Sequence, residues 1–360
     1  MKVGIIDADL IGRKRHRFPN LACLKISGYH KDRGDEVFLL TRYDGLDSFD
    51  KVYLSKVFTD TPVPEWVLNL SNVEFGGTGF FFDEAPNLPG EIEHHFPDYH
   101  LYDDFIEARL AEGAKKSEFK EYLNYSIGFL TRGCFRKCPF CVNQKYDRVF
   151  EHSPLSEFYD PERPNICLLD DNFFGCPNWK TLLQELMDTG KKFKFKQGLD
   201  ERLLTDEKVQ LLCKARYDGD PTFAFDNIAD YPLIEEKLKM LRKYTDRQFN
   251  FYVLVAFEGQ DAADIESAFK RIELLMRYKC LPYIMRFERY RDSPYSGMYI
   301  TLARWCNQPS FFKKKSFREF CFSTNGQSAS AGRYASQFET EHPDIAARYF
   351  DMKWEGGDAE

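Results

Sequence analysis

The first 85 residues alternate short apolar runs with polar and amphipathic stretches. Four of these runs have the length and composition of strands: residues 2–7, 36–41, 51–58 and 73–80. Between the first two, residues 21–31 follow a helical pattern. This order predicts a small open parallel sheet with helices on its faces, so we expect a Rossmann-like α/β domain over residues 1–100.

From residue 124 onward the alternation becomes regular. Six apolar runs predict strands: 125–130, 165–170, 193–200, 221–226, 251–257 and 281–287. Amphipathic runs separate most of them: 179–189, 206–215, 233–244 and 263–279. Six β/α units in series predict a parallel sheet that curves into a partial (β/α)6 TIM-like barrel over residues 124–323. Functional groups of such folds lie at the carboxyl ends of the strands.

Two stretches lie outside these domains. Residues 87–105 are rich in proline and acidic residues, which is typical of connecting structure at the surface, and we place a connecting segment at 101–123. Residues 324–360 begin rich in Gly and Ser and end in acidic residues. They predict a peripheral C-terminal tail.

Composition narrows the class of protein. A formal net charge of -7 disfavours a protein that binds nucleic acid by electrostatics. The N-terminus lacks the pattern of a signal peptide, and no stretch approaches the roughly 18 apolar residues of a membrane span, so we expect no membrane and a cytoplasmic location. In a reducing compartment the ten cysteines should not form disulfides. Clustered cysteines then indicate a metal, and scattered ones indicate packing.

Three cysteines cluster in the loop after the first barrel strand. Cys134, Cys138 and Cys141 have the spacing C-x3-C-x2-C. Structural zinc takes four ligands, whereas an iron-sulfur cube with three protein thiolates keeps one iron open for a further ligand. The zinc alternative needs a fourth ligand from Cys167, Cys176 or His152, none of which has the paired spacing of a zinc site. The other cysteines stand singly in apolar stretches and predict packing: Cys23, Cys213, Cys280, Cys306 and Cys321.

This spacing, with the aromatic Phe140 before the last cysteine, resembles the signature of the radical S-adenosylmethionine superfamily. The resemblance covers roughly residues 120–320. It implies that the three cysteines ligate a 4Fe-4S cluster and that bound S-adenosylmethionine is cleaved to methionine and a 5'-deoxyadenosyl radical. That radical would abstract hydrogen from an unidentified substrate, and an electron donor such as flavodoxin or ferredoxin would reduce the cluster.

The resemblance also implies contacts to S-adenosylmethionine at the strand ends. Asp170, Asp171 and Asn172, followed by Phe173, match an acidic-acidic-x-Phe pattern that contacts the methionine amine. The remaining candidates are Gln197, Asp200 and Arg202 for the methionine carboxylate, Asp226 for the ribose, and Glu258 and Arg286 at later strand ends. Two alternatives stay open. Residues 170–172 could cap the helix at Trp179, and the charged residues could form salt bridges at the barrel rim.

The N-terminal domain carries two glycine-containing turns. Asp7, Asp9 and Gly12 form D-x-D-x-x-G, and GGTG at residues 76–79 contributes Gly76, Gly77 and Gly79. They resemble positions in the cobalamin-binding domain of many radical enzymes. The usual middle residue is a cobalt-ligating His, and here it is Asp9. We therefore expect a domain of the cobalamin-binding type without cobalamin.

Two alternative functions remain. One is a cobalamin-dependent radical S-adenosylmethionine methyltransferase, and the other is a non-catalytic, zinc-stabilised binding module. Whether the protein is a hydrogen-abstracting radical enzyme or the methyltransferase, Arg304 and the basic residues 313–315 could contact an anionic substrate or the electron donor.

Overall fold

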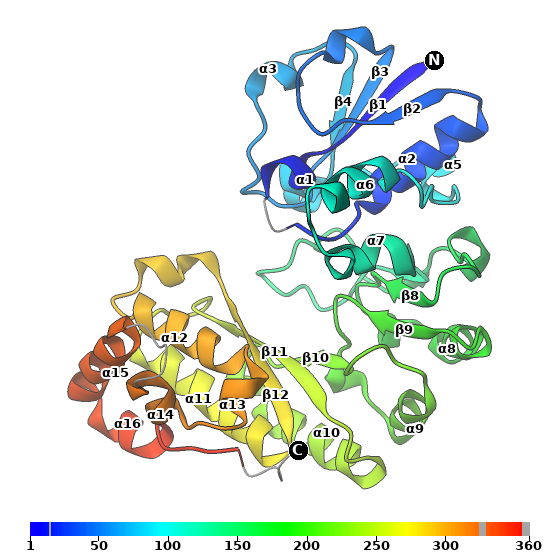
Figure 1. The fold of residues 1–360 in the computed structure, drawn as a ribbon. Coiled ribbons are helices and arrows are strands. Elements are labelled where there is room, and N and C mark those ends of the chain that lie inside the picture. Colours follow the sequence, from blue (N-terminus) through cyan, green and yellow to red (C-terminus); the bar gives the residue numbers. More distant parts are fainter. Residues whose placement is uncertain (14–15, 324–328, 355–360) are drawn as a thin grey trace. The chain divides into compact units, whose positions relative to one another are not determined.

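The computed structural model describes residues 1–13, 16–323 and 329–354 as a mixed α/β chain with parallel sheets (Figure 1). The chain divides into two compact units, residues 1–197 and 198–360. None of the helices in the described ranges combines the length and the apolar character needed to span a bilayer.

The first unit begins with a four-stranded parallel sheet in the order β2-β1-β3-β4. Its strands are β1 (Lys2–Asp7), β2 (Glu36–Leu39), β3 (Lys51–Ser55) and β4 (Val73–Gly76). Val3 and Ile5 of β1 are fully buried in the cluster that includes helix α2, and Ile6 is buried in a second cluster with β3. Successive residues of β1 thus enter opposite cores, which explains why this strand is apolar along its whole length.

The first unit contains a second parallel sheet, in the order β5-β8-β9. Its strands are β5 (Tyr125–Gly128), β8 (Asn165–Leu168) and β9 (Lys192–Phe195). A short antiparallel ribbon, β6 (Thr131–Arg132) with β7 (Phe150–Glu151), follows β5. The helices of this unit are α1 (Ala8–Gly12), α2 (Leu21–Asp32), α3 (Glu65–Leu68), α4 (Thr78–Phe81), α5 (Gly90–Glu93), α6 (Asp103–Ala111), α7 (Lys120–Asn124) and α8 (Trp179–Asp188).

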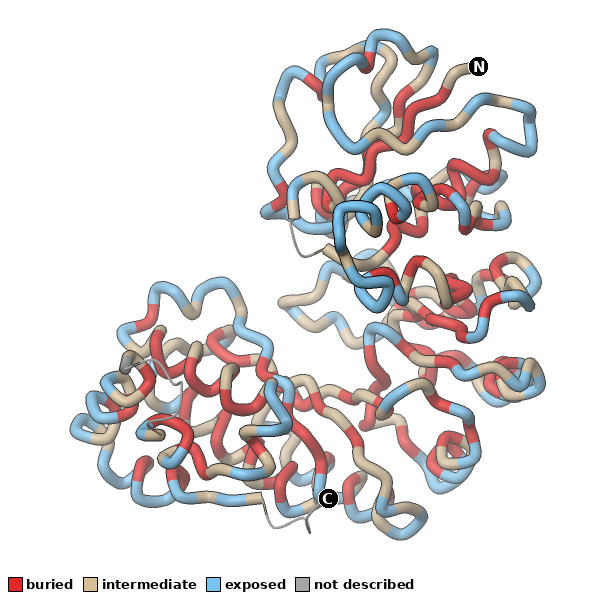
Figure 2. Tube along the Cα trace, viewed as in Figure 1, coloured by how far each residue is buried: buried red, intermediate tan, exposed pale blue. Residues whose placement is uncertain are grey.

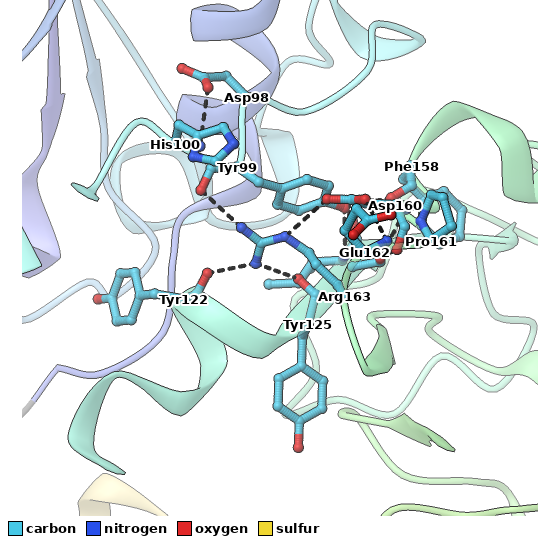
Figure 3. Close-up of polar contacts among 12 residues, drawn as sticks. Asp98, Tyr99, His100, Tyr122, Tyr125, Phe158, Asp160, Pro161, Glu162 and Arg163 are labelled. Atoms are coloured by element: carbon cyan, nitrogen blue, oxygen red, sulfur yellow. Dashed lines mark hydrogen bonds and ion pairs between the residues drawn. The ribbon is translucent and has the colours of Figure 1, made fainter. Parts of the chain in front are cut away.

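Arg163 links the segment before β5 to the second sheet (Figure 3). Its guanidinium is buried and donates hydrogen bonds to the carbonyl oxygens of Tyr99 at 3.0 Å, Tyr122 at 2.7 Å and Tyr125 at 3.2 Å. The same group lies 4.2 Å from the centre of the Tyr99 ring. The Tyr99 hydroxyl in turn accepts a hydrogen bond from the backbone N–H of Ile127 in β5. One side chain therefore satisfies three buried acceptors from separate parts of the chain.

The second unit is built on a parallel sheet in the order β10-β11-β12. Its strands are β10 (Thr222–Ala224), β11 (Phe249–Val255) and β12 (Cys280–Arg286). The helices are α9 (Asp206–Lys214), α10 (Tyr231–Tyr244), α11 (Ala262–Arg277), α12 (Ser296–Cys306), α13 (Pro309–Phe312), α14 (Phe317–Phe322), α15 (Ala329–Glu341) and α16 (Pro343–Tyr349). Alternate residues of β11 are buried, and α11 and α12 supply much of the remaining core (Figure 2).

All ten predicted strands form. In the described part of the chain, the six strands pair as two separate sheets of three. After β9, residues 196 and 197 form a turn and Gly198 has φ +88°, so the extended backbone is interrupted there. Leu199 then makes a single parallel bridge with Phe223. The mixed α/β class with parallel sheets is confirmed, while the barrel, the Rossmann-like domain and the domain limits stay predictions.

The prediction of a peripheral tail is wrong for residues 329–354. Helix α15 buries Ala331, Ala335 and Phe338, spaced four and three residues apart on one face, and α16 buries Ala346 and Tyr349. Small residues made this segment look like a linker, although small residues also allow helices to pack closely. The other tail positions, 324–328 and 355–360, lie outside the described residues.

We expect Arg163→Met to destabilise the protein by about 2–4 kcal/mol, because several buried carbonyl oxygens lose their donor. Urea unfolding followed by circular dichroism measures this loss. Arg109→Met is the matched control, since Arg109 pairs with Glu112 at the exposed surface of α6. It should change the free energy of unfolding by no more than about 0.5 kcal/mol. Equal effects of the two substitutions would contradict a central role for Arg163.

Candidate functional site

The cysteine loop, residues 133–149, is closed at its base by the β6/β7 ribbon. Thr131 pairs with Glu151 and Arg132 with Phe150. Gly133 begins the loop with φ +87°, and a Cβ atom there would lie 2.3 Å from the carbonyl oxygen of Arg148. Only glycine fits this crossing without a shift of backbone. The two ends of the loop are therefore held close together.

The three thiols of the loop are partly exposed, and two of them accept hydrogen bonds. The backbone N–H of Arg136 and the side-chain amide of Asn172 each donate to Sγ of Cys134 at 3.4 Å. The backbone N–H of Asn143 donates to Sγ of Cys141 at 3.4 Å. Such donors stabilise negative charge on sulfur, and they tune iron-sulfur clusters.

The loop is also braced by polar residues that follow the last cysteine. The Gln144 side-chain amide donates to the carbonyl oxygens of Cys138 at 2.6 Å and Cys141 at 2.9 Å. Lys145 Nζ donates to the Ala85 carbonyl oxygen at 3.1 Å and to Asn87 Oδ1 at 2.7 Å. Neither Gln144 nor Lys145 was predicted from the sequence. Their position shortly after the last cysteine could have indicated a role in the loop.

The acidic segment after β8 holds the start of the loop. Asp170 is fully buried, and its Oδ1 accepts from the N–H and the hydroxyl of Thr131, both at 2.7 Å. Its Oδ2 accepts from the N–H of Leu130 at 3.2 Å. Asp171 Oδ2 accepts from the N–H of Gly133 at 2.7 Å. Residues 170–172 thus contact positions 130–134 in order, and they end at the first cysteine.

This arrangement bears on the predicted roles of residues 170–172. The alternative that they cap the helix at Trp179 is wrong, because the N-cap residue of α8 is Asn178. Asp171 is partly exposed, whereas Asp170 and Asn172 are buried. Burial raises the pKa of Asp170 to about 7, although its hydrogen-bond donors favour the carboxylate. Contact of this segment with an amine stays a prediction, as does the role of Phe140, which lies half-buried beside Cys141.

The cysteines outside the loop differ from those within it. Burial raises the pKa of Cys280 and Cys321 to about 12, and it raises the pKa of Cys23 and Cys306 well above the usual value. These four are buried, as predicted for packing residues. Cys213 is partly exposed, and its pKa is also raised by burial. Such thiols stay protonated at neutral pH and are poor metal ligands.

The residues proposed as a fourth zinc ligand are buried or already make other contacts. Cys167 is fully buried in β8, and Cys176 is 1% exposed with a pKa raised by burial. The two ring nitrogens of His152 lie 3.0 Å from Ser153 Oγ and 3.3 Å from Glu93 Oε1. The zinc alternative therefore gains no ligand from this set.

The donor chemistry of the loop fits an iron-sulfur cluster, because three accessible thiols share one short loop that supplies N–H groups to sulfur. Across residues 1–13, 16–323 and 329–354, however, no three His, Cys, Asp or Glu side chains are arranged to hold a metal ion. The role of the three loop cysteines as ligands stays a prediction.

In the second unit, Arg202 lies within a salt-bridge network. Its Nε lies 2.8 Å from Asp200 Oδ1, and its Nη1 lies 3.3 Å from Asp230 Oδ2. Hydrogen bonding and charge from Asp200, with further charge from neighbouring carboxylates, outweigh burial and raise the pKa of Arg202. The rim salt bridge left open by the sequence is thus present. A contact of Arg202 with a ligand carboxylate stays a prediction.

Glu201, which the sequence analysis passed over, is 2% exposed and accepts a hydrogen bond from the N–H of Ala224 at 3.0 Å. Burial and the charge of Asp200 raise the pKa of Glu201 to about 8. Its position between two candidate residues was the only sequence signal.

Each of the other predicted strand-end residues has its own local environment. Gln197 is exposed at the end of the first unit. Asp226 Oδ1 accepts from the N–H of Leu254 at 3.1 Å. Glu258 accepts from the side-chain amide of Asn227 at 3.0 Å, and the Arg286 guanidinium lies 4.7 Å from the centre of the Tyr290 ring. The roles of these residues toward a nucleotide stay predictions.

The acidic motif of the N-terminal sheet is buried. The Tyr102 hydroxyl donates to Asp7 Oδ2 at 2.9 Å, and burial raises the pKa of Asp7 to about 7. Asp9 accepts from the N–H of Val57 at 2.7 Å and from the Thr61 hydroxyl. Gly77 has φ +104°, and a Cβ atom there would lie 2.3 Å from a backbone oxygen. These residues bind the loops at the carboxyl end of the sheet to one another.

No protein-family model and no curated protein matches the sequence. Among solved structures, the chain is similar to the cobalamin-dependent S-adenosylmethionine radical enzyme OxsB, whose structure has aqua-cobalamin and S-adenosylmethionine bound. The identity is 13% and the TM-score 0.46, and the match covers 98% of this chain and 64% of that chain. This chain thus spans less than two thirds of OxsB.

Asp171→Ala should remove the acceptor for Gly133 and loosen the start of the loop, whereas Asp171→Asn keeps an acceptor oxygen. A hydrogen bond to a charged group contributes about 1.5–3 kcal/mol, so the amides of residues 133 and 134 should exchange roughly tenfold faster in the Ala variant. Hydrogen exchange measured on the metal-free protein tests this. Wild-type exchange in Asp171→Ala would show that the bond does not hold the loop.

The raised pKa of Glu201 predicts a pH dependence of stability. An unfolded Glu ionises near pH 4.5, whereas folded Glu201 keeps its proton to about pH 8. The folded state therefore binds more protons between these values, and wild-type stability should fall as pH rises across this window, by up to roughly 1.4 kcal/mol per pH unit. Glu201→Gln should flatten this slope in urea unfolding at pH 5, 6.5 and 8. An unchanged slope would contradict the raised pKa.

Proposed function

We propose that this protein is a radical S-adenosylmethionine enzyme that binds a 4Fe-4S cluster through Cys134, Cys138 and Cys141. The observation that carries the proposal is the cysteine loop itself. It follows a strand of a parallel sheet, presents three partly exposed thiols with the spacing C-x3-C-x2-C, and is fixed at its start by the carboxylates that end the neighbouring strand.

When bound, such a cluster supplies one electron to S-adenosylmethionine, whose C5'–S bond breaks to leave methionine and a 5'-deoxyadenosyl radical that takes hydrogen from substrate. The protein groups position these components. The N–H donors at Cys134 and Cys141 stabilise charge on sulfur, and Asp170 and Asp171 hold the loop at the strand ends.

The proposed contacts to S-adenosylmethionine have less structural support than the proposed ligation of the cluster. Asp171 and Asn172 lie beside the first cysteine and would receive the methionine amine. Gln197, Asp200 and Arg202 would contact the methionine carboxylate, and Asp226 would contact the ribose. Arg202 would then have to exchange a partner such as Asp230 for the ligand.

The electron donor we propose is an acidic protein such as flavodoxin or ferredoxin. Its docking surface would include the basic segment 313–315, where Lys314 and Lys315 line a pocket with Arg318 and Phe322. The charge of Arg318 is already balanced by Glu339 and Asp351, which leaves the lysines as the groups that would meet an acidic partner.

A cobalamin-dependent methyltransferase is the alternative enzyme. The buried and doubly hydrogen-bonded Asp9 occupies the position of the usual cobalt-ligating His, so this chain would have to bind cobalamin without that ligand. We therefore do not favour it. A non-catalytic zinc-stabilised module is less well supported still, because the residues named as its fourth ligand are buried or already engaged.

The proposal predicts an iron-sulfur protein that cleaves S-adenosylmethionine. After anaerobic reconstitution with iron and sulfide, wild type should be brown and form 5'-deoxyadenosine on reduction with dithionite, whereas Cys138→Ala should form none. Cys213→Ala is the matched control, because Cys213 is also partly exposed but lies outside the loop. It should keep the activity of wild type.

A colourless wild-type protein with stoichiometric zinc, and no 5'-deoxyadenosine, would favour the binding module. Added cobalamin that binds and raises turnover would favour the methyltransferase. Equal loss of activity in Cys138→Ala and Cys213→Ala would mean that the loop has no special role.

A further inference from the structure

A cluster of charged residues packs against the β6/β7 ribbon at the base of the cysteine loop. Glu93, the last residue of α5, lies at its centre. Lys25 comes from α2, Arg132 from β6, and His152 follows β7 directly. The cluster therefore joins two helices that precede the ribbon in sequence to both strands of the ribbon.

The contacts within the cluster are short and largely buried. Glu93 Oε1 lies 3.3 Å from His152 Nε2 and 3.5 Å from Lys25 Nζ. The exposed fractions of the side chains are 17% for Glu93, 12% for His152 and 5% for Lys25. Lys25 Nζ also donates to the Glu93 carbonyl oxygen. The other ring nitrogen of His152 lies 3.0 Å from Ser153 Oγ. The backbone N–H of His152 donates to the carbonyl oxygen of Leu130. Three contacts therefore hold this histidine in place.

The charges converge on one carboxylate. Burial alone would raise the pKa of Glu93, but the hydrogen bond from His152 and the positive charges of Lys25 and Arg132 outweigh it and lower this pKa to about 2. The Arg132 guanidinium lies 4.0 Å from the centre of the Phe129 ring, and its buried Nε finds no acceptor among the described residues. Without Glu93, the buried Lys25 would lose the carboxylate that lies 3.5 Å from its Nζ.

We propose that Glu93 is a positioning residue for the cysteine loop: through His152 it holds the ribbon from which Cys134, Cys138 and Cys141 extend. The expected effect on retention of the cluster rests on the proposed function. The physical basis of the positioning role is independent of any metal. Asp170 and Asp171 hold the loop from the end of β8, and Glu93 holds the same base from α5.

The first experiment uses the metal-free full-length protein. Hydrogen exchange of the amides in residues 130–152 is compared in wild type, Glu93→Gln and Glu91→Gln. Glu91 lies on the same helix and is exposed, and its carboxylate accepts a hydrogen bond from the Tyr29 hydroxyl. It therefore serves as the matched control. Exchange in this segment should rise in Glu93→Gln and match wild type in Glu91→Gln.

The second experiment uses the reconstituted protein and follows transfer of iron to a chelator. Loss of residues that orient metal ligands commonly weakens metal binding by about 10–100-fold. Glu93→Gln should therefore release iron about tenfold faster than wild type. Glu93→Asp, which keeps the charge, should restore part of the retention. The double variant Glu93→Gln with His152→Gln should release iron no faster than Glu93→Gln, because both act through one contact.

The outcomes separate this inference from the proposed function. A wild type that forms 5'-deoxyadenosine, with Glu93→Gln indistinguishable from it in both experiments, would overturn the inference and leave the function standing. A wild type that binds no cluster, with faster exchange in Glu93→Gln, would remove the function and keep the positioning role. Faster exchange in Glu93→Gln and Glu91→Gln alike would point to general loosening of α5 and count against the inference. An additive double variant would also count against it.

Discussion

The cysteine loop depends on a buried carboxylate that is satisfied entirely by backbone and hydroxyl donors. Asp170 follows strand β8 by two residues, and it accepts hydrogen bonds from residues 130 and 131, which lead into the β6/β7 ribbon. A buried carboxylate without donors is very costly, so this geometry is strongly specified. Because β5 and β8 are adjacent and parallel, their carboxyl ends meet, and one strand can define where the loop of the other begins.

Much of the local structure followed from the sequence, because strand and helix patterns are set by nearby residues. Ten of the twelve described strands were predicted, all but the short β6 and β7, and helices such as α8 and α10 were found nearly to their ends. The continuity of the six barrel strands was not predictable in the same way, since it depends on pairings between distant segments. The turn at residues 196–197 and the positive φ of Gly198 interrupt it, and a lone glycine in an apolar run gives no clear sign of this.

The candidate site was predictable in its residue types and only partly in its contacts. The cysteine spacing and the acidic strand end marked the right positions, because chemistry of this kind needs those side chains. Their hydrogen-bond partners could not be predicted, since Asp171 and Gly133 lie 38 positions apart in the sequence. Glu93 had no local signal at all. It stands in a proline-rich, acidic stretch that resembles a connection, and its role emerges only where that stretch packs against the ribbon.

Burial separates six of the ten cysteines from the other four, and the three loop cysteines differ from the fourth, Cys213, in sharing one short segment. A thiol in an apolar core keeps its proton, as the raised pKa values of Cys280 and Cys321 indicate, so it contributes packing and little reactivity. The loop cysteines are partly exposed, and Cys134 and Cys141 accept hydrogen bonds from N–H groups. The fold therefore brings the candidate ligands together on a loop whose base is held by Asp170 on one side and Glu93 on the other.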